Sequence, residues 1–279
     1  MIIRLAIKNL SFSYTSRKIL NDMNLDVGDG QIVSIVGPNG SGKSTLIKCI
    51  DKILTPSSGS IQVDRQEITT MDRMELARNV AYVPQNSLRV FPNSVFDVVL
   101  MGRRPHLGWR GDSFDEQKVW MVLQVLGIED LALSPFNELS GGQQQKVLIA
   151  RALAQDTGVI LLDEPTSNLD IWHQIDVMEI LRSLMRKQDL TALIAIHDLN
   201  IAARYSDSIV MMKRGRIVAA GKPDTVLTAE NLTSVYGIQA NVRMIDDVPY
   251  IIPMARIPVK PGIGLQRKNP HHAEGIPLR

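Results

Sequence analysis

The sequence contains one cysteine and no long apolar run. Cys49 is the only cysteine among 279 residues, so no intrachain disulfide can form and a reducing compartment is favoured. No apolar stretch approaches the ~20 residues that a membrane-spanning helix needs. The first seven residues read as a strand and lack the features of a signal peptide. These absences favour a cytoplasmic protein that reaches a membrane only through a partner.

The two signs of charge are nearly balanced. Lysine and arginine contribute 31 residues and aspartate and glutamate 29, which gives a formal net charge of +2. General nucleic-acid binders are far more basic, so we expect no nucleic-acid partner. Hydrophobic residues make up 44% and charged residues 22%, as in typical soluble globular proteins. In such a chain we expect Cys49 to be a small buried hydrophobe.

A glycine-rich segment carries the clearest chemistry. It lies between a β-branched apolar run, Ile32–Val36, and a stretch that can continue as a helix, as a phosphate-binding loop requires. Glycines let backbone N–H groups approach an anion, and the helix directs its positive end at the phosphates. We expect Lys43 to reach the β- and γ-phosphates and Ser44 to ligate Mg²⁺. The segment consists of Gly37, Pro38, Asn39, Gly40, Ser41, Gly42, Lys43, Ser44 and Thr45.

Two carboxylates, Asp163 and Glu164, follow the apolar run at residues 159–162. Ligands of open parallel sheets bind beyond the carboxyl ends of the strands, so both acids are expected at the ligand edge. Asp163 suits the Mg²⁺ shell, and Glu164 suits a general base that orients water. A buried strand that meets a solvated turn would explain the pattern alone. The phosphate loop favours the catalytic interpretation, because a bound nucleotide needs a carboxylate beside its metal.

A second helix start has the character of an anion site. Ser140 and Gln143 form an S-x-x-Q capping box at the start of a helix expected to run to about Ala154. Capping explains these residues locally. A serine, two glycines and a helix N-terminus also bind anions, and a second such start in one chain needs a functional explanation.

The remaining pattern indicates an α/β protein with a helical insertion. Residues 1–36 read as short strands and residues 86–140 as helical. From residue 159 strands alternate with helices, which predicts a parallel sheet covered on both faces. Residues 253–279 hold five of the 14 prolines and five Lys or Arg against one Glu, so we expect an extended or disordered tail.

Taken together, the motifs resemble those of ABC transporter ATP-binding subunits over about residues 1–240. In chain order they are the adenine-stacking Tyr14, the phosphate loop, the Q-loop Gln85, the signature Leu139–Gln143, the Walker B pair Asp163 and Glu164, the D-loop Ser167–Asp170 and the switch His197. Asn168 stands where alanine is commoner in the family.

The resemblance implies an α/β P-loop NTPase of ABC ATPase type. Its core is a mostly parallel sheet, accompanied by an N-terminal antiparallel β subdomain and a helical signature subdomain inserted at about residues 86–155. Residues 241–279 form a C-terminal extension, with the Pro-rich basic tail from about 253.

The resemblance also implies a role for each motif residue. Those implied in ATP hydrolysis are Lys43, Gln85, Glu164 and His197. Those implied in Mg²⁺ binding are Ser44, Gln85 and Asp163. Those implied in contacting ATP that is held by a second subunit are Ser140, Gly141, Gly142 and Gln143. We therefore expect a homodimer, or a pair with a similar subunit, that sandwiches ATP and Mg²⁺.

A narrower resemblance concerns the cargo. Val95–His106 and Leu199–Ala203 are similar to the iron-siderophore, haem and cobalamin importer branch. This predicts an ATPase at the cytoplasmic face of the membrane that drives uptake through a separate permease. An external substrate-binding protein would be an indirect partner. The permease would dock at Phe91–Arg110.

Two other classes remain as alternatives. A soluble ABC ATPase, such as one for iron–sulfur cluster assembly, shares the motifs, although the long coiled coils of repair-type relatives and the double cassette of translation-type relatives are absent from the sequence. A regulatory nucleotide binder without activity is disfavoured by the intact Glu164 and His197.

Overall fold

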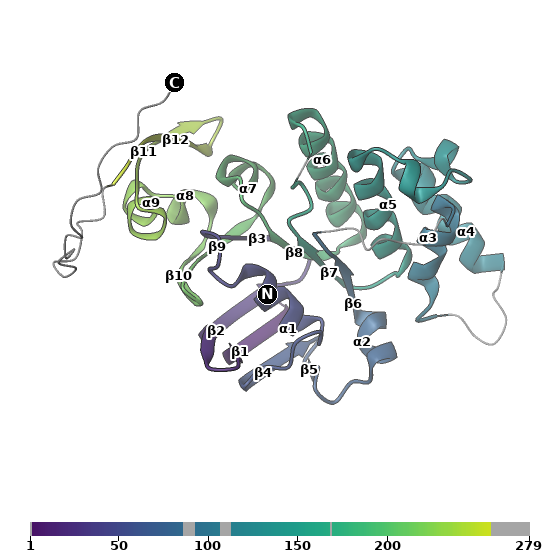
Figure 1. Cartoon of the computed structure of the whole chain (residues 1–279), viewed down its shortest axis with the longest axis horizontal. Coiled ribbons are helices and arrows are strands. Elements are labelled where there is room, and N and C mark those ends of the chain that lie inside the picture. Colours follow the sequence, from purple (N-terminus) through teal and green to yellow (C-terminus); the bar gives the residue numbers. More distant parts are fainter. Residues whose placement is uncertain (1, 86–92, 107–112, 168, 258–279) are drawn as a thin grey trace, which may run out of the picture.

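The computed structural model describes residues 2–85, 93–106, 113–167 and 169–257. Its centre is a six-stranded sheet with the order β10-β9-β3-β8-β7-β6 (Figure 1). The strands are β3 Ile32–Val36, β6 Val80–Val83, β7 Val159–Asp163, β8 Thr191–Ala195, β9 Ser208–Lys213 and β10 Arg216–Gly221. All neighbours pair in parallel except β10 with β9. The expected mostly parallel core is confirmed.

A second, antiparallel sheet with the order β2-β1-β4-β5 forms the N-terminal subdomain. Its strands are β1 Ile3–Tyr14, β2 Arg17–Gly28, β4 Ser58–Val63 and β5 Gln66–Glu67. The expectation of short strands in residues 1–36 was wrong for the first two, which have 12 residues each. Several register shifts interrupt their pairing, so the period-two pattern is broken along strands that are continuous.

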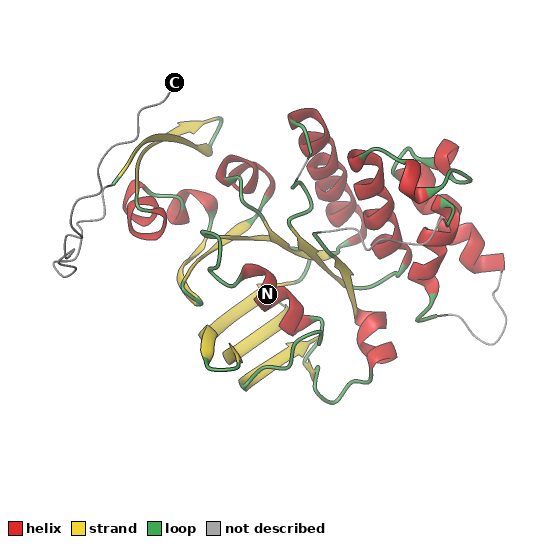
Figure 2. Cartoon of the chain, viewed as in Figure 1, coloured by secondary structure: helices red, strands yellow, loops and turns green. Residues whose placement is uncertain are grey.

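Helices cover the central sheet and form the insertion (Figure 2). The α-helices are α1 Lys43–Ile50, α2 Arg73–Asn79, α3 Val95–Leu100, α4 Ser113–Val125, α5 Gly141–Ala154, α6 Ile171–Gln188, α7 Leu199–Tyr205, α8 Pro223–Val226 and α9 Ala229–Tyr236. Three short 3₁₀ helices are η1 Met101–Arg103, η2 Glu129–Leu131 and η3 Phe136–Glu138. The described part of the expected insertion is therefore helical. Across the described ranges, no helix has the length and apolar character needed to cross a membrane.

The two faces of the central sheet pack into two different cores. In β8, Ala192 and Ile194 belong to the core shared with helices such as α5 and α6. Leu193 and Ala195, on the opposite face, belong to the core shared with the antiparallel sheet and α1. This alternation explains why the parallel strands are apolar at nearly every position. Cys49 is fully buried in α1, as expected, and burial raises the pKa of its thiol to about 12.

The C-terminal region differs from the expectation. β11 Ile238–Ile245 and β12 Val248–Arg256 form a two-stranded antiparallel hairpin beside α7, α8 and α9 (Figure 1). The boundary expected near residue 240 falls inside β11, and the tail expected from about 253 begins inside β12. Pro253 lies opposite Ala240 in the hairpin. Residues 258–279 of the expected tail lie outside the described residues.

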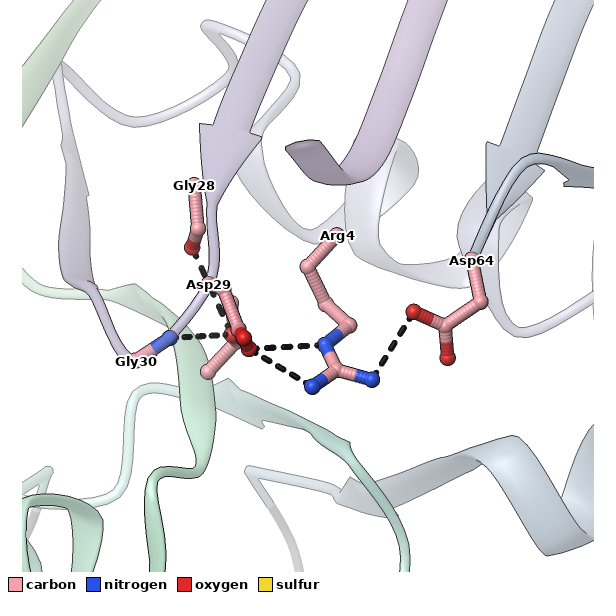
Figure 3. Close-up of polar contacts among 6 residues, drawn as sticks. Arg4, Gly28, Asp29, Gly30 and Asp64 are labelled. Carbon is pink, nitrogen blue, oxygen red and sulfur yellow. Dashed lines mark hydrogen bonds and ion pairs between the residues drawn. The ribbon is translucent and has the colours of Figure 1, made fainter. Parts of the chain in front are cut away.

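Arg4 ties the antiparallel sheet to the turns around it (Figure 3). Its guanidinium donates to Asp29 at 2.9 and 2.6 Å and to Asp64 at 2.8 Å. Next to Asp29, the N–H of Gly30 donates to the Thr191 hydroxyl at 3.0 Å, at the start of β8. The network therefore links β1, the turn before β3 and the central sheet.

We predict that Arg4→Ala lowers the free energy of unfolding by about 1–2 kcal/mol. The substitution removes the charge-assisted hydrogen bonds from Arg4 to Asp29 and Asp64. Both ion pairs are partly exposed to solvent, which reduces the contribution of each to stability. Urea unfolding measures the change. Arg216→Ala, at an exposed position, is the control and should stay within about 0.5 kcal/mol of wild type. Equal effects of the two substitutions would contradict a role for the Arg4 network.

Candidate active site

The register of four neighbouring strands brings the separate motifs to one edge of the sheet. β3, β8, β7 and β6 are parallel neighbours, so their carboxyl ends lie together. β3 leads into the phosphate loop, and β8 leads to His197. β7 ends at Asp163 and is followed by Glu164, and β6 is followed two residues later by Gln85. Motifs up to about 160 residues apart in sequence thus converge on one place.

A pocket of about 330 Å³ opens at this edge. Its lining residues are Asn39, Gly40, Ser41, Gly42, Lys43, Ser44, Thr45, Gln85, Glu164 and His197. Each of them was singled out from the sequence. Gly37 and Pro38 come directly before Asn39 in the chain and do not line the pocket. Asp163 does not line it either, but it accepts a hydrogen bond from Ser44, which does. The structure therefore brings together the residues predicted for phosphate binding, metal binding and hydrolysis.

The phosphate loop needs glycine where the backbone turns tightly. Gly37 has φ +154°, and a Cβ there would lie 2.3 Å from the carbonyl oxygen of Met212 in β9. Gly42 has φ +106° at the N-cap of α1, and its Cβ would lie 2.8 Å from the Leu20 side chain. The buried Ser41 hydroxyl has no hydrogen-bond partner among the described residues. Such a cradle of helix N–H groups with an unused hydroxyl suits a phosphate.

Lys43 is a buried cation at the base of the pocket. Its side chain is 5% exposed, and Nζ donates to the carbonyl oxygen of Gly37 at 2.9 Å. Burial lowers the pKa of this ammonium, while the nearby charges of Glu164 and Asp163 act in the opposite direction. An ammonium carries three donors, so Lys43 has donors left for the oxygen atoms of a ligand.

Ser44 and Asp163 form the part of the pocket that fits a hard divalent cation. The Ser44 hydroxyl donates to Oδ1 of Asp163 at 2.7 Å. Burial raises the pKa of Asp163, and the Ser44 hydrogen bond and the charges of Lys48 and Lys43 oppose that rise. Hydroxyl and carboxylate oxygens are ligands that Mg²⁺ accepts. Among the described residues, no cluster of three His, Cys, Asp or Glu could hold a metal alone. Phosphate oxygens and water molecules would complete this shell.

Glu164 sits at the centre of a polar triad. The Gln85 amide donates to its Oε2 at 2.5 Å, and His197 Nε2 contacts its Oε1. Glu164 is 8% exposed, whereas His197 is 44% exposed at the pocket mouth. The backbone of Glu164 has φ +53°, and its N–H donates to the Ala195 carbonyl oxygen at 3.0 Å. A carboxylate held this way by its neighbours can accept a proton from a water molecule in the pocket.

Comparison with known proteins decides the family. Residues 20–167, more than half of the chain, match the family model described as ABC transporter. This chain belongs to the ABC transporter family. ATP-binding proteins of this family are ATPases that power transport, so this chain is an ABC cassette with ATPase activity.

Three relatives of this cassette span most of the chain. An uncharacterized ABC transporter ATP-binding protein of Methanocaldococcus jannaschii is 45% identical over 90% of this chain and 98% of its own length. The ferric enterobactin transport ATP-binding protein FepC of Escherichia coli is 36% identical, covering 91% and 96%. The cobalamin import ATP-binding protein BtuD of Halobacterium salinarum is 38% identical, covering 85% and 60%.

Solved ABC transporter structures share the cassette's fold. One assigned to a metal-chelate type ABC transporter in an inward-facing conformation has a TM-score of 0.79 at 32% identity, covering 91% of this chain and 98% of that one. The dimeric bacterial cassette MJ0796 has a TM-score of 0.70 at 30% identity, covering 78% and 98%. ABC cassettes thus form dimers, and the MJ0796 cassette has also been solved with bound ADP and phosphate.

The signature of this cassette lies apart from its own phosphate pocket. Ser140 caps α5 by accepting from the Gln143 N–H at 3.3 Å, and the Gln143 side chain accepts from the Ser140 N–H at 3.0 Å. The predicted capping box is confirmed. Ser140 and Gly141 are exposed, and no signature residue lines the 330 Å³ pocket. Gly142 lies against α6, where a Cβ would come within 2.4 Å of the His173 ring. The helix start is therefore free to face another molecule.

Other predicted residues lie near or beyond the pocket. Tyr14 ends β1, is 49% exposed and packs edge-to-face on Phe12 at 4.8 Å, but it does not line the pocket. Asn168 and parts of Phe91–Arg110 lie outside the described residues. The sequence motifs did not identify Tyr236 of α9. Its hydroxyl is buried near the Gly37 backbone, and this burial raises the pKa of the Tyr236 phenol. Tyr236 follows no local pattern that marks it as a phosphate-loop neighbour.

We predict that Lys43→Ala weakens ATP binding by at least tenfold, because a desolvated ammonium is removed from the phosphate cradle. Titration with a fluorescent ATP analogue measures the affinity. Lys187→Ala, on the exposed end of α6, is the control and should bind like wild type. An unchanged affinity of Lys43→Ala would remove this lysine from the nucleotide site.

Proposed function

We propose that this chain hydrolyses ATP to drive uptake of an iron-siderophore, haem or cobalamin through a separate membrane permease. The observation that carries the proposal is the Glu164 carboxylate, held by Gln85 and His197 at the mouth of the phosphate pocket. A nucleotide site built only for binding has no need for an acceptor aligned where the attacking water would lie.

In the proposed reaction each residue has a distinct task. The phosphate loop and Lys43 hold the β- and γ-phosphates and offset the charge that develops during transfer. Glu164 orients a water molecule in line with the γ-phosphate and accepts its proton. His197 holds the γ-phosphate and Glu164 together from the open side of the pocket. Ser44, Asp163 and Gln85 would bind Mg²⁺, which supplies positive charge beside the phosphates.

We infer that the working unit is a dimer with ATP between its subunits. Support comes from the exposed start of α5, which has the chemistry of an anion site but lies outside the chain's own pocket. The dimeric relative provides further support. In such a dimer Ser140, Gly141, Gly142 and Gln143 would contact the γ-phosphate held by the other copy. ATP would close the dimer, and hydrolysis would release it.

The import direction and cargo class rest on the relatives. Those named for ferric enterobactin and cobalamin transport each match at least 85% of this chain, and the iron-siderophore reading ranks first because that group is broad. These relatives favour an importer over a soluble ABC ATPase for cluster assembly. The chain would then work at the cytoplasmic face of the membrane, with a permease as direct partner and an external binding protein as indirect partner.

We predict that Glu164→Gln leaves ATP binding intact and lowers turnover by about 10²–10⁴-fold, the scale of a positioned acid–base group. Glutamine preserves the shape of the side chain but removes its ability to accept the proton. Steady-state phosphate release measures turnover, and Glu179→Gln on the exposed face of α6 serves as the control. Near wild-type release from Glu164→Gln would refute the assigned role.

A second prediction concerns the partner. Tagged protein that is purified from gently solubilised native membranes should carry a polytopic membrane protein at comparable abundance, identified by mass spectrometry. The identity of that permease would narrow the cargo. Recovery with soluble partners alone, and absence from the membrane fraction, would instead support the soluble class of ABC ATPase.

A further inference from the structure

A side-chain amide of α7 makes two hydrogen bonds to the C-terminal hairpin. Asn200 Nδ2 donates to the Ile251 carbonyl oxygen at 3.2 Å, and the Ile251 N–H donates to Asn200 Oδ1 at 2.8 Å. The amide thus pairs with one residue of β12 as a neighbouring strand would. Ile251 is 3% exposed, so the two hydrogen bonds lie at a packed junction where unpaired groups would be costly.

The helix held in this way begins directly after the switch histidine. Asp198 caps α7 by accepting from the backbone N–H groups of Asn200 at 2.8 Å and Ile201 at 3.0 Å. His197, one residue earlier, contacts Glu164. α7 has seven residues, and a helix that short does not hold its position without tertiary packing. The His197 backbone is therefore held from two sides. Before it, the Ile196 N–H donates to the Ile35 carbonyl oxygen at 3.0 Å, and after it comes the first turn of α7.

A second contact joins the same C-terminal unit, residues 223–256, to β9, the strand beside β3 and its phosphate loop. Lys213, at the end of β9, donates to the carbonyl oxygen of Ser234 in α9. Two residues after Ser234 is Tyr236, which is partly buried and whose buried hydroxyl lies near the Gly37 backbone. The unit thus contacts the strand beside the phosphate loop and the helix that follows the switch. It lies outside the residues matched by the family model.

We propose that Asn200 is a positioning residue for ATP hydrolysis, through which the β11–β12 hairpin holds α7 and so keeps His197 aligned with Glu164. The proposal rests on the proposed function, because it assigns Asn200 an effect on hydrolysis at that same site. Asn200 does not touch the nucleotide pocket and acts only through His197.

The first test compares Asn200→Ala with wild type in steady-state ATP hydrolysis. Loss of the two hydrogen bonds should lower kcat by roughly tenfold, while the affinity for ATP stays within about twofold of wild type, because the phosphate loop is unchanged. Asn231→Ala is the matched control, since Asn231 also donates to a backbone carbonyl, that of Val226, within the same unit. It should lower the melting temperature comparably and leave kcat unchanged.

A double-mutant cycle separates positioning from general destabilisation. In the His197→Ala background, Asn200→Ala should lower the residual single-turnover rate by less than about twofold, because its effect passes through His197. A full tenfold loss in that background, or a wild-type kcat in Asn200→Ala itself, would overturn the proposal. An equal loss of kcat in Asn231→Ala would also overturn it.

Asn200→Asp provides the test if Asn200→Ala does not fold. Aspartate has the same shape and keeps the acceptor for the Ile251 N–H, but it loses the donor to the Ile251 carbonyl oxygen. We expect a kcat reduced by roughly threefold or more, and a wild-type kcat would contradict the proposal. If wild type hydrolyses no ATP, the proposed function fails. If wild type is active, His197→Ala is impaired and the Asn200 variants match wild type, only the present inference fails.

Discussion

The parallel register of β3, β8, β7 and β6 is the constraint on which the site depends. Ile35 lies opposite Ala195, and Ala195 lies opposite Asp163, so one row of residues crosses three strands at the ligand edge. The phosphate loop, His197 and Glu164 all follow within two residues of this row. A slip of one residue in any strand would reverse its faces and remove a group from the pocket. Burial of both faces in separate apolar cores holds the register in place.

Several polar groups at the carboxyl edge of the sheet make fewer hydrogen bonds than they could, so they can still bind a ligand. Lys43 and Ser41 are buried against the phosphate loop with donors still available, while Asp163 shares one hydrogen bond with Ser44. Glu164 is held from two sides, by Gln85 and His197. Buried polar groups with unused hydrogen-bonding capacity lower the stability of the protein when no nucleotide is bound. The burial of apolar side chains in the two surrounding cores offsets this loss.

Local pattern was sufficient to predict most of the site, because each motif is short and its neighbours on the chain are strands or helix starts. The phosphate loop between Val36 and α1, and the capping box at Ser140, can each be recognised from a few consecutive residues, although the loop also packs against Met212 and Leu20. The β11–β12 hairpin was not predicted. Its turn, Asp246-Asp247, has both residues at positive φ but lacks the glycine that usually marks such a turn. The contacts of Asn200 with Ile251 join distant segments, which no local pattern reports.

The capping box has a further consequence for the proposed dimer, in which the two subunits would have to separate as well as close. Without a ligand, the hydroxyl of Ser140 accepts a hydrogen bond from the N–H of Gln143. The hydroxyl oxygen thus occupies a donor at the exposed start of α5 that an anion would otherwise use. A phosphate that binds there has to displace the Ser140 hydroxyl from the Gln143 N–H or share that N–H with it. The net gain in binding free energy is then only the difference between the new hydrogen bond and the internal one. In the proposed dimer, this competition would keep the affinity of one subunit for the nucleotide of the other moderate. The interface would then separate readily after the terminal phosphate is lost.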